Sequence, residues 1–452
     1  MVLKLGIVAH LTRVLAPEGF GILGWGTALV SYLVLLSTFG LDIVGTREAA
    51  RQTGDHLTLV EHIIGVRLMI GSVLLVVMVV VLWSLPVSTL LRMVLIAQGG
   101  MLVVQALDVE WFYRGIERMR AVAVRNLTAD VAQLIGVLAW VRDPTDIVKA
   151  AWISTAAMGL VASGMLMSYF RDFGWILPRV DRTVWAKLVR PAAPLALAAL
   201  MVAVYYSSDR LMLGWLRGAG DVGQYEAAYR LMGVVVAPGH ILSQAYFPSL
   251  VAGAESQALR LTHGKEYATL MMAIGWPLAA IMAVLAEPVM VWFAGTAYQA
   301  AALPLAILMG SVAAVYLNVV LGQSLLAWNY NRMYLIAVTS GAVFNVGANL
   351  FLIPKYGAAG AAAATVGAEL VAMMVVAYGY RKATGSLPLG AAWKAGVLAG
   401  GAAGATWWLL QAGLPAWSAA AGGGMSALSA VMGWAAWRGI RLRGIIESAI
   451  RG

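Results

Sequence analysis

Residues 205–250 read YYSSDRLMLGWLRGAGDVGQYEAAYRLMGVVVAPGHILSQAYFPSL, and this stretch decides the fold class. It contains two apolar runs of membrane length, separated by the short glycine-rich loop 217–221. Four charged side chains lie inside these runs, namely Asp209, Arg210, Glu226 and Arg230. Charge within a bilayer is costly, so it is normally kept where it faces a protein interior or an aqueous cavity. The pattern indicates a protein that moves a polar cargo through a membrane.

The composition of the whole chain excludes a soluble protein. Of its 452 residues, 61% are hydrophobic and only 12% are charged, whereas soluble domains average about a quarter charged residues. The net charge of +10 comes from basic residues scattered over short loops, so membrane orientation explains it better than nucleic-acid binding. The chain has no cysteine, which excludes disulfides, thiolate catalysis and cysteine-ligated metals.

Apolar stretches of about 20 residues, the length that spans hydrocarbon, recur throughout the chain. We predict an all-α polytopic membrane protein with thirteen or fourteen spans. Thirteen are well defined: 20–40, 63–85, 90–112, 119–140, 147–169, 192–216, 222–248, 268–293, 301–328, 333–353, 357–380, 390–410 and 416–437. Residues 1–13 rise only about 20 Å as a helix, which is too short to cross a hydrocarbon core of about 30 Å. We interpret them as a truncated first helix whose true start lies upstream.

Basic residues concentrate in alternate loops, which predicts the orientation of the chain. The rich set is Arg47, Arg51, Arg114, Arg118, Arg120, Arg171, Arg179, Arg182, Lys187, Arg260, Lys265, Arg332, Arg381, Lys382, Arg438, Arg441, Arg443 and Arg451. The sparse set is Arg13, Arg142, Lys149, Arg217 and Lys355. Loops rich in lysine and arginine stay in the cytoplasm. We therefore expect a multi-pass protein of the inner (plasma) membrane with both termini in the cytoplasm.

The two halves of the chain share a weak sequence repeat. Residues 17–21 (PEGFG) resemble residues 220–225 (GDVGQY), and each segment leads into a span. Parallel repeats of six spans occur in several transporter folds. We therefore predict two pseudo-symmetric six-helix lobes around a central cavity, at 1–186 and 187–384. Residues 385–452 would add two further spans and a basic cytoplasmic tail.

Several segments, in their order and spacing, resemble the Wzx-type oligosaccharide flippases, in the superfamily that includes the MATE exporters. These segments are 13–21 (RVLAPEGFG), 39–42 (FGLD), 45–51 (GTREAAR), 209–214 (DRLMLG), 222–225 (VGQY), 227–231 (AAYRL), 288–295 (PVMVWFAG), 352–357 (LIPKYG) and 360–365 (GAAAAT). The resemblance implies a flippase that moves an undecaprenyl-diphosphate-linked oligosaccharide from the inner to the outer leaflet by alternating access, for surface polysaccharide biosynthesis. Such proteins carry a complete helix before the first segment, which is nearly absent here.

A flippase breaks no bond, so no catalytic residue and no cofactor are expected, and the lone histidines predict no metal site. A path for diphosphate favours arginine, whose planar fork can bind two phosphate oxygens. Arg67 and Arg125 are predicted to lie one to two turns inside the cytoplasmic face, where they could either capture the diphosphate or snorkel to the interface. Arg47 and Arg230 complete the predicted substrate-binding set, although Arg47 fits a simple topology signal equally well.

Two acidic residues fall near the middle of predicted spans. Asp130 and Glu369 are candidates for proton or sodium coupling, or they are neutral acids hydrogen-bonded within the bundle. The four charges of the opening stretch sum to zero and should lie together in the outer half of the membrane. We interpret Asp209, Arg210, Glu226 and Arg230 as gate pairs on the periplasmic side.

Other functions remain open at this stage. A MATE-like antiporter of small cations or drugs would suit a more acidic cavity, and a lipid II flippase is a close neighbour of the favoured function. A membrane polymerase or ligase of lipid-linked glycans is less consistent with this sequence, because those enzymes typically carry a large periplasmic loop and every predicted outer loop here is short. The expected partners are the lipid-linked oligosaccharide, membrane lipids and polysaccharide polymerase or export proteins, with the flippase itself a monomer.

Overall fold

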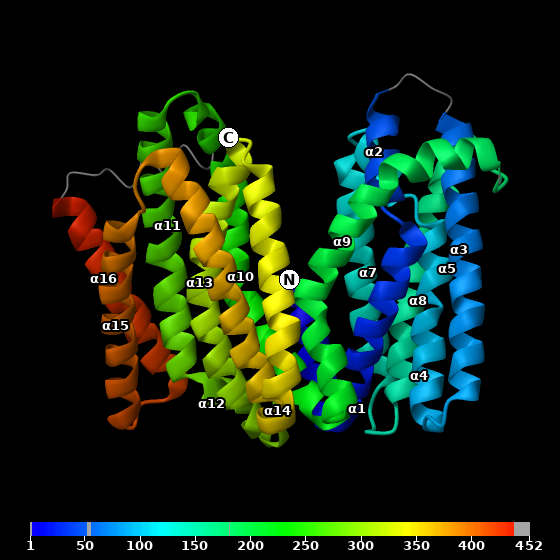
Figure 1. Ribbon diagram of the computed structural model, residues 1–452. Helices are drawn as coiled ribbons and strands as arrows, with labels where there is room; N and C mark the ends of the chain where they lie inside the picture. Colours follow the sequence, from blue (N-terminus) through cyan, green and yellow to red (C-terminus); the bar gives the residue numbers. More distant parts are fainter. Residues whose placement is uncertain (1, 52–55, 180, 438–452) are drawn as a thin grey trace. The chain divides into compact units, whose positions relative to one another are not determined.

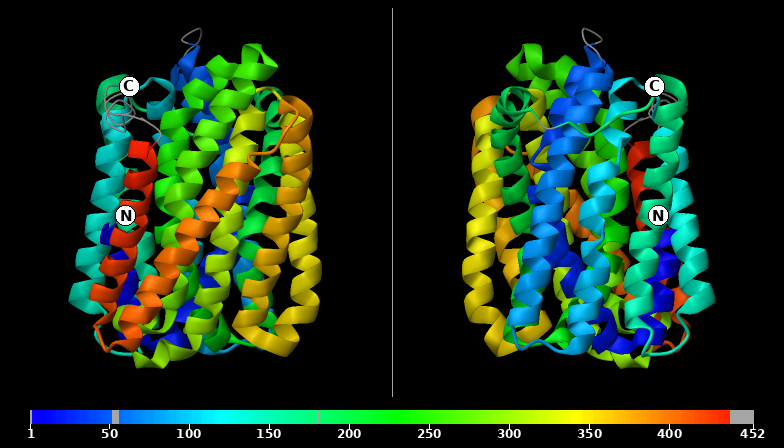
Figure 2. Two further views of the ribbon diagram at one scale, coloured as in Figure 1. Left: turned by 90° about the vertical axis from the view of Figure 1, so that its left-hand side faces the viewer. Right: turned by 90° about the vertical axis from the view of Figure 1, so that its right-hand side faces the viewer.

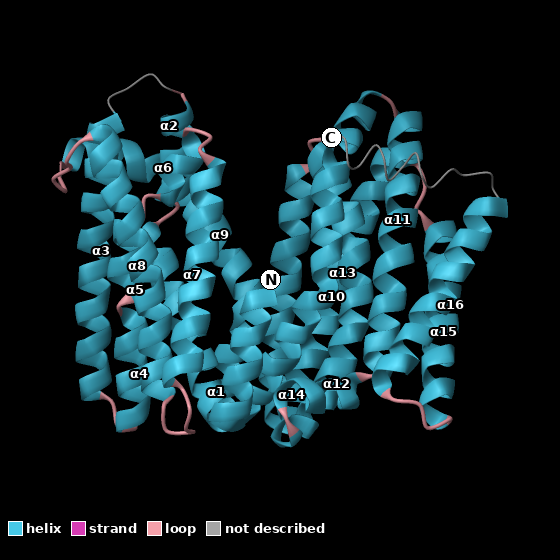
Figure 3. Cartoon of the chain, turned by 180° about the vertical axis from the view of Figure 1, so that it is seen from behind, coloured by secondary structure: helices cyan, strands magenta, loops and turns pink. Residues whose placement is uncertain are grey.

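The computed structural model describes residues 2–51, 56–179 and 181–437. Helices joined by loops make up this part of the chain, without a strand (Figure 3). Ten of the described helices are long and apolar enough to cross a membrane. The prediction of an all-α polytopic protein is therefore confirmed. The chain forms two compact units, Met1–Gly223 and Gln224–Gly452, and each is described by itself.

Nine helices lie in the described part of the first unit (Figure 1). They are α1 (Val2–Thr38), α2 (Leu41–Ala50), α3 (His56–Ser84), α4 (Thr89–Gly99), α5 (Met101–Leu107), α6 (Glu110–Gly115), α7 (Met119–Trp140), α8 (Ile147–Phe173) and α9 (Arg182–Leu216). The last of these was predicted to open the second lobe, yet it packs on α1, where the Tyr32 hydroxyl donates to the Ala203 carbonyl oxygen at 3.0 Å. The predicted domain limits at 186 and 384 stay predictions.

The first helix doubles back on itself at Ala16, whose φ of 55° and ψ of 175° are not helical. The arm before the break follows α7, because Lys4 lies 3.7 Å from Asp130 and His10 Nε2 lies 2.8 Å from the Val141 carbonyl oxygen. After the break, the chain returns along α9. Residues 1–13, interpreted as a truncated helix, thus form from Val2 onward a helical arm joined to the predicted first span.

Loops of the first unit gather at two ends. One end, which we call the basic face, carries the basic loops: Arg118 on the α6–α7 loop pairs with Asp172 of α8 at 2.7 Å, and Arg179 pairs with Glu61 of α3 at 3.1 Å. The other end carries the turn at Ala16 and the α7–α8 loop. This grouping within the unit agrees with the predicted alternation of loops. The basic tail beyond residue 437 lies outside the described residues.

The two segments of the sequence repeat contact each other within the first unit. A methyl group on Gly21 would overlap the Ala219 carbonyl oxygen at the start of α10 (Ala219–Ala252). A methyl group on Gly223 would overlap the Pro17 carbonyl oxygen in turn. Each glycine of the repeat thus faces the backbone of the other segment, which is the reciprocal contact that a two-fold repeat produces. Only glycine permits so close an approach of two backbones.

We expect Gly223→Ala to destabilise the protein by about 1–3 kcal/mol, because overpacking against a backbone atom cannot be relieved by a rotamer change. Thermal unfolding of the purified protein in detergent measures this effect. The matched control is Gly220→Ala, one turn earlier, where an added methyl meets nothing within 4 Å. Since alanine favours helix over glycine by up to about 1 kcal/mol, the control should be neutral or stabilising. Equal effects of the two substitutions would contradict the close contact.

A second close contact positions α2 against α6 on the basic face. The ring of Trp111 lies against Gly45, and Gly115 faces the Thr46 carbonyl oxygen. Thr46 also donates from its hydroxyl to the Trp111 carbonyl oxygen at 3.0 Å. Next to Trp111, Phe112 is fully buried and contacts the rings of Tyr169, Phe173 and His56 with centroid separations of 5.0–5.6 Å. Packing therefore fixes α6 between α2, α3 and α8.

The second unit contains most of α10 and the helices that follow it (Figure 2). They are η1 (Gly253–Glu255), α11 (Gln257–Val284), α12 (Ala286–Ala294), η2 (Thr296–Ala301), α13 (Ala302–Ala327), α14 (Asn331–Thr384), α15 (Leu389–Gln411) and α16 (Ala416–Trp437). The long α14 contains a break at Gly357, with φ 55° and ψ −131°. It therefore supplies the two spans predicted at 333–353 and 357–380.

Helix α13 lies at the centre of the second unit. Its Tyr316 is buried against Gly239 and Gly275 and donates to the Val235 carbonyl oxygen at 2.8 Å. Trp276 of α11 donates to the Ala313 carbonyl oxygen at 3.0 Å. Small residues, the Tyr316 hydroxyl and the Trp276 indole thus join α10, α11 and α13, as is usual where helices must satisfy polar groups inside a membrane.

Candidate functional site

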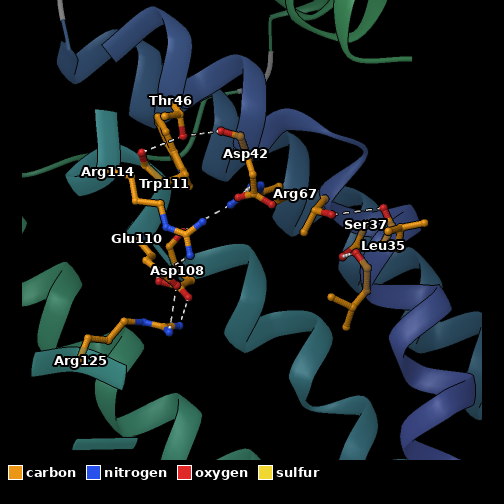
Figure 4. A network of polar contacts seen from close by, with 12 residues as sticks. Leu35, Ser37, Asp42, Thr46, Arg67, Asp108, Glu110, Trp111, Arg114 and Arg125 are labelled. Atoms are coloured by element: carbon orange, nitrogen blue, oxygen red, sulfur yellow. Dashed lines mark hydrogen bonds and ion pairs between the residues drawn. The ribbon is translucent and has the colours of Figure 1, made fainter. Parts of the chain in front are cut away.

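Six charged side chains form a connected network near the basic face of the first unit (Figure 4). Arg67 of α3 pairs with Asp42 of α2, and Arg125 of α7 pairs with Asp108, which lies between α5 and α6. Arg125 also pairs with Glu110 at 3.0 Å. Glu110 in turn pairs with Arg114, one turn further along α6. We call these residues, Asp42, Arg67, Asp108, Glu110, Arg114 and Arg125, the charge network.

The centre of the charge network is buried. The side chains of Arg67, Asp108 and Arg125 are 0%, 2% and 7% exposed. Arg67 Nη1 also donates to the Asp108 carbonyl oxygen at 3.3 Å, so the two ion pairs are joined. Burying a charge costs several kcal/mol, which only a well-paired arrangement offsets. Removal of one partner would leave the other as an uncompensated buried charge.

A cavity of about 490 Å³ borders this network. Asp42, Asp108, Glu110 and Arg114 line it together with Ile43, Thr46, Arg47, Gln105 and Trp111. The Arg47 side chain is exposed, and no described carboxylate lies within ion-pair distance of it. Four arginines, counting Arg47, face three carboxylates, so the site carries one net positive charge. It is suited to an anion that can displace a carboxylate from an arginine.

The predicted substrate-binding arginines occupy different positions in this site. Arg47 lines the cavity directly. Arg67 lies behind Asp42, and Arg125 lies behind Asp108 and Glu110, so both hold carboxylates of the cavity wall. Both guanidinium groups are buried among these carboxylates, and their capture of the diphosphate stays a prediction. Arg230 lies in the second unit and is described with the gate pairs below.

Comparison with known proteins identifies the family. A family model described as "Polysaccharide biosynthesis protein" matches residues 1–253. The chain belongs to the polysaccharide biosynthesis protein family. The matched region covers the whole charge network.

Relatives of this family member support the assignment. A curated relative is the "Putative O-antigen transporter" of Escherichia coli (strain K12), 22% identical over 340 residues that cover 72% of this chain and 80% of the relative. The fold is similar to that of the lipid II flippase MurJ in an inward closed conformation, with a TM-score of 0.80, 11% identity and 96% coverage of both chains. An inward-facing MATE family multidrug transporter gives a TM-score of 0.66 at 15% identity, over 85% of this chain and 94% of that one. The two structural likenesses show a shared fold, and the family model together with the O-antigen transporter relative confirms the predicted family resemblance.

The two predicted coupling residues of this family member both have polar partners. Asp130 lies 3.7 Å from Lys4 of the α1 arm. Glu369 of α14 is 6% exposed and accepts a hydrogen bond of 2.6 Å from Asn318 of α13. They lie in different units, and their role in proton or sodium coupling stays a prediction.

The predicted gate pairs divide between the two units. In the second unit, Glu226 is 1% exposed and pairs with Arg230 at 2.6 Å, one helical turn apart. In the first unit, Asp209 is buried, and Arg210 donates to the Tyr206 carbonyl oxygen at 3.0 Å. Arg230 is therefore engaged by a neighbouring acid, and its part in a gate or in cargo binding stays a prediction.

The sequence reading missed the carboxylates of the site. Asp42 belongs to the family segment 39–42, but no role was assigned to it. Asp108 and Glu110 lie within the predicted span 90–112, where two acids two residues apart are a visible anomaly. Their number is the signal that could have identified them. Three acids near one membrane face need about as many arginines as partners for their charge. For Arg114, the sequence indicates only a residue of a basic loop.

Proposed function

We propose that this protein is a flippase that moves a polyprenyl-diphosphate-linked oligosaccharide from the inner to the outer leaflet of the cytoplasmic membrane. The observation that carries the proposal is the charge network, in which buried arginines hold the carboxylates of a cavity open at the basic face. A diphosphate that enters the cavity meets Arg47 and Arg114 first. Arginine forks bind phosphate oxygens bidentately, so the phosphate can replace Glu110 on Arg114.

Family and fold support the same function. The polysaccharide biosynthesis family, the fold shared with a lipid II flippase and the 22% identity to a putative O-antigen transporter support a glycan carried on a lipid as the cargo. Export then requires the polar headgroup to cross the bilayer while the polyprenyl chain stays in lipid. We place the basic face in the cytoplasm, because loops rich in arginine remain there.

The arrangement of charges favours an anion over a cationic drug. Each carboxylate of the cavity, Asp42, Asp108 and Glu110, is already paired with an arginine. A cation would have to displace a guanidinium group that is held in place by burial. When a phosphate displaces a carboxylate, in contrast, each arginine keeps a negatively charged partner.

The proposal is tested by deleting the gene and locating the lipid-linked oligosaccharide. We expect the intermediate to accumulate in the inner leaflet, where added glycosidase cannot reach it in intact spheroplasts, and export to return with a plasmid copy. Susceptibility to cationic drugs measured on the same strains tests the antiporter alternative and should be unchanged. Normal surface glycan in the deletion strain would refute the flippase function.

A further inference from the structure

A second cavity of about 860 Å³ lies between α7 and α8 in the first unit. Its upper part is lined by the α6–α7 corner, including Glu117, Arg118 and Arg120. The rest is lined by mostly apolar or small side chains of α7 and α8, namely Ala121, Val124, Leu160, Val161, Gly164 and Met165, together with the hydroxyl groups of Thr128 and Ser168. We call this cavity the α7–α8 groove. It is separate from the site that borders Asp42.

The walls of the α7–α8 groove face hydrocarbon. On α7, Val124 lines the groove and is 57% exposed, and Val131 and Ile135 continue the row of exposed apolar side chains beyond it, at 38% and 59%. On α8, Leu160 lines the groove and is 60% exposed, and Met167, outside the groove on the same helix, is 62% exposed. Large apolar side chains in such rows are typical of a lipid-facing surface, whereas a water-filled passage is lined by polar groups. The groove therefore opens toward the acyl chains of the bilayer.

Positive charge collects at the polar end of this groove. Arg118, Arg120 and Arg125 line it against the single carboxylate of Glu117. Arg118 is held by Asp172 at 2.7 Å, and Arg125 belongs to the charge network. Arg120 is exposed and has no ion pair or hydrogen bond to any described residue. Its guanidinium group is thus available to a ligand at the level of lipid headgroups.

The floor of the groove contains free space. An added Cβ on Gly164 would meet nothing within 4 Å, although Gly164 lies in the middle of a long helix. Basic pockets between transmembrane helices near the cytoplasmic face bind the headgroups of anionic lipids. An apolar channel beneath such a pocket accommodates an acyl chain.

We propose that the α7–α8 groove binds one anionic phospholipid of the membrane. Its phosphate lies at Arg120 and Arg118, and one acyl chain runs along the groove over Gly164. This site is distinct from the proposed path of the transported headgroup, and its test does not depend on transport. Because Arg125 lines the groove and also holds Asp108, the bound lipid lies directly beside the charge network.

The experiment is native mass spectrometry of the full-length protein with added phosphatidylglycerol or phosphatidylethanolamine. We expect the protein to retain one phosphatidylglycerol and to bind phosphatidylethanolamine more weakly. Gly164→Leu, which fills the groove without a protein clash, should lower phosphatidylglycerol occupancy at least tenfold. Arg120→Gln should lower its affinity about fivefold, the effect of one arginine near a lipid surface.

Two matched controls keep the test specific. Gly310→Leu places the same side chain at another exposed helical glycine with nothing within 4 Å of its Cβ. Arg171→Gln removes an arginine that is 84% exposed on the same face but does not line the groove. Both should retain the lipid. Equal binding of the two lipids, unchanged occupancy in Gly164→Leu, or displacement of the lipid by a short-chain polyprenyl diphosphate would overturn the proposal.

Discussion

Arg125→Gln is expected to abolish export and to remove most of the folded protein. The substitution leaves Asp108, which is 2% exposed, as a buried carboxylate without its arginine. Breaking a buried pair from one side costs about 3–5 kcal/mol, which is a large part of the stability of a typical domain. The amount of monodisperse protein in fluorescence-detected gel filtration and its thermal midpoint measure this loss.

A second substitution separates folding from cargo binding in this experiment. Asp108→Asn in the Arg125→Gln background removes the stranded charge and should restore the amount of folded protein. Export should stay absent, because the diphosphate has lost an arginine of the network. Arg114→Gln is the control for stability: its pair with Glu110 is at the surface, since Arg114 is 54% exposed, and such pairs contribute at most about 1 kcal/mol. Recovery of export in the double variant would refute a role of Arg125 in transport.

Arg47→Ala is expected to lower the rate of export about ten- to a hundredfold at an unchanged protein level. Arg47 lines the cavity and pairs with no described carboxylate, so its removal strands no charge. Loss of one hydrogen bond to a charged phosphate weakens binding by about 1.5–3 kcal/mol, which corresponds to this factor. Initial rates of flipping in proteoliposomes at limiting lipid-linked oligosaccharide measure the effect, and Arg47→Glu should be more severe.

The control for this prediction lies one turn away at the end of the same helix. Arg51, the residue that follows α2, is also exposed, at 66%, and pairs with Glu48 at 2.9 Å, but it does not line the cavity. Arg51→Ala removes the same charge from the same face and should leave the rate within about twofold, because exposed pairs contribute little. Equal rates for the Arg47 and Arg51 variants would show that only the overall surface charge matters.

Much of the architecture could be predicted from the sequence, because membrane spans obey a strong rule of length and polarity. Helix α7 begins and ends at the predicted Met119 and Trp140. The repeat was visible in two short glycine-containing segments, and these segments contact each other. The helical arm before Ala16 was less predictable, since its apolar run is short and its packing along α7 depends on distant residues.

The candidate site was only partly predictable, for a physical reason. A sequence shows which charges lie at membrane depth but not which of them meet. Arg67 and Arg125 could therefore be named as charges inside predicted spans, while their partners Asp42, Asp108 and Glu110 could not. Likewise, Asp130 is an isolated acid in the sequence, because its partner Lys4 is more than a hundred residues away in the chain. Pairing of this kind is decided by tertiary packing.

The balance of charges in the network also bears on what drives transport. The six residues of the charge network sum to zero, so that apart from Arg47 the charge that crosses the membrane with the proposed cargo is that of the cargo itself. A diphosphate carries about two negative charges. Its outward movement through a potential of 100 mV, negative inside, lowers its free energy by about 5 kcal/mol. A nearly neutral wall thus leaves the cargo exposed to the electrical field, and the membrane potential can pull the headgroup toward the outer leaflet.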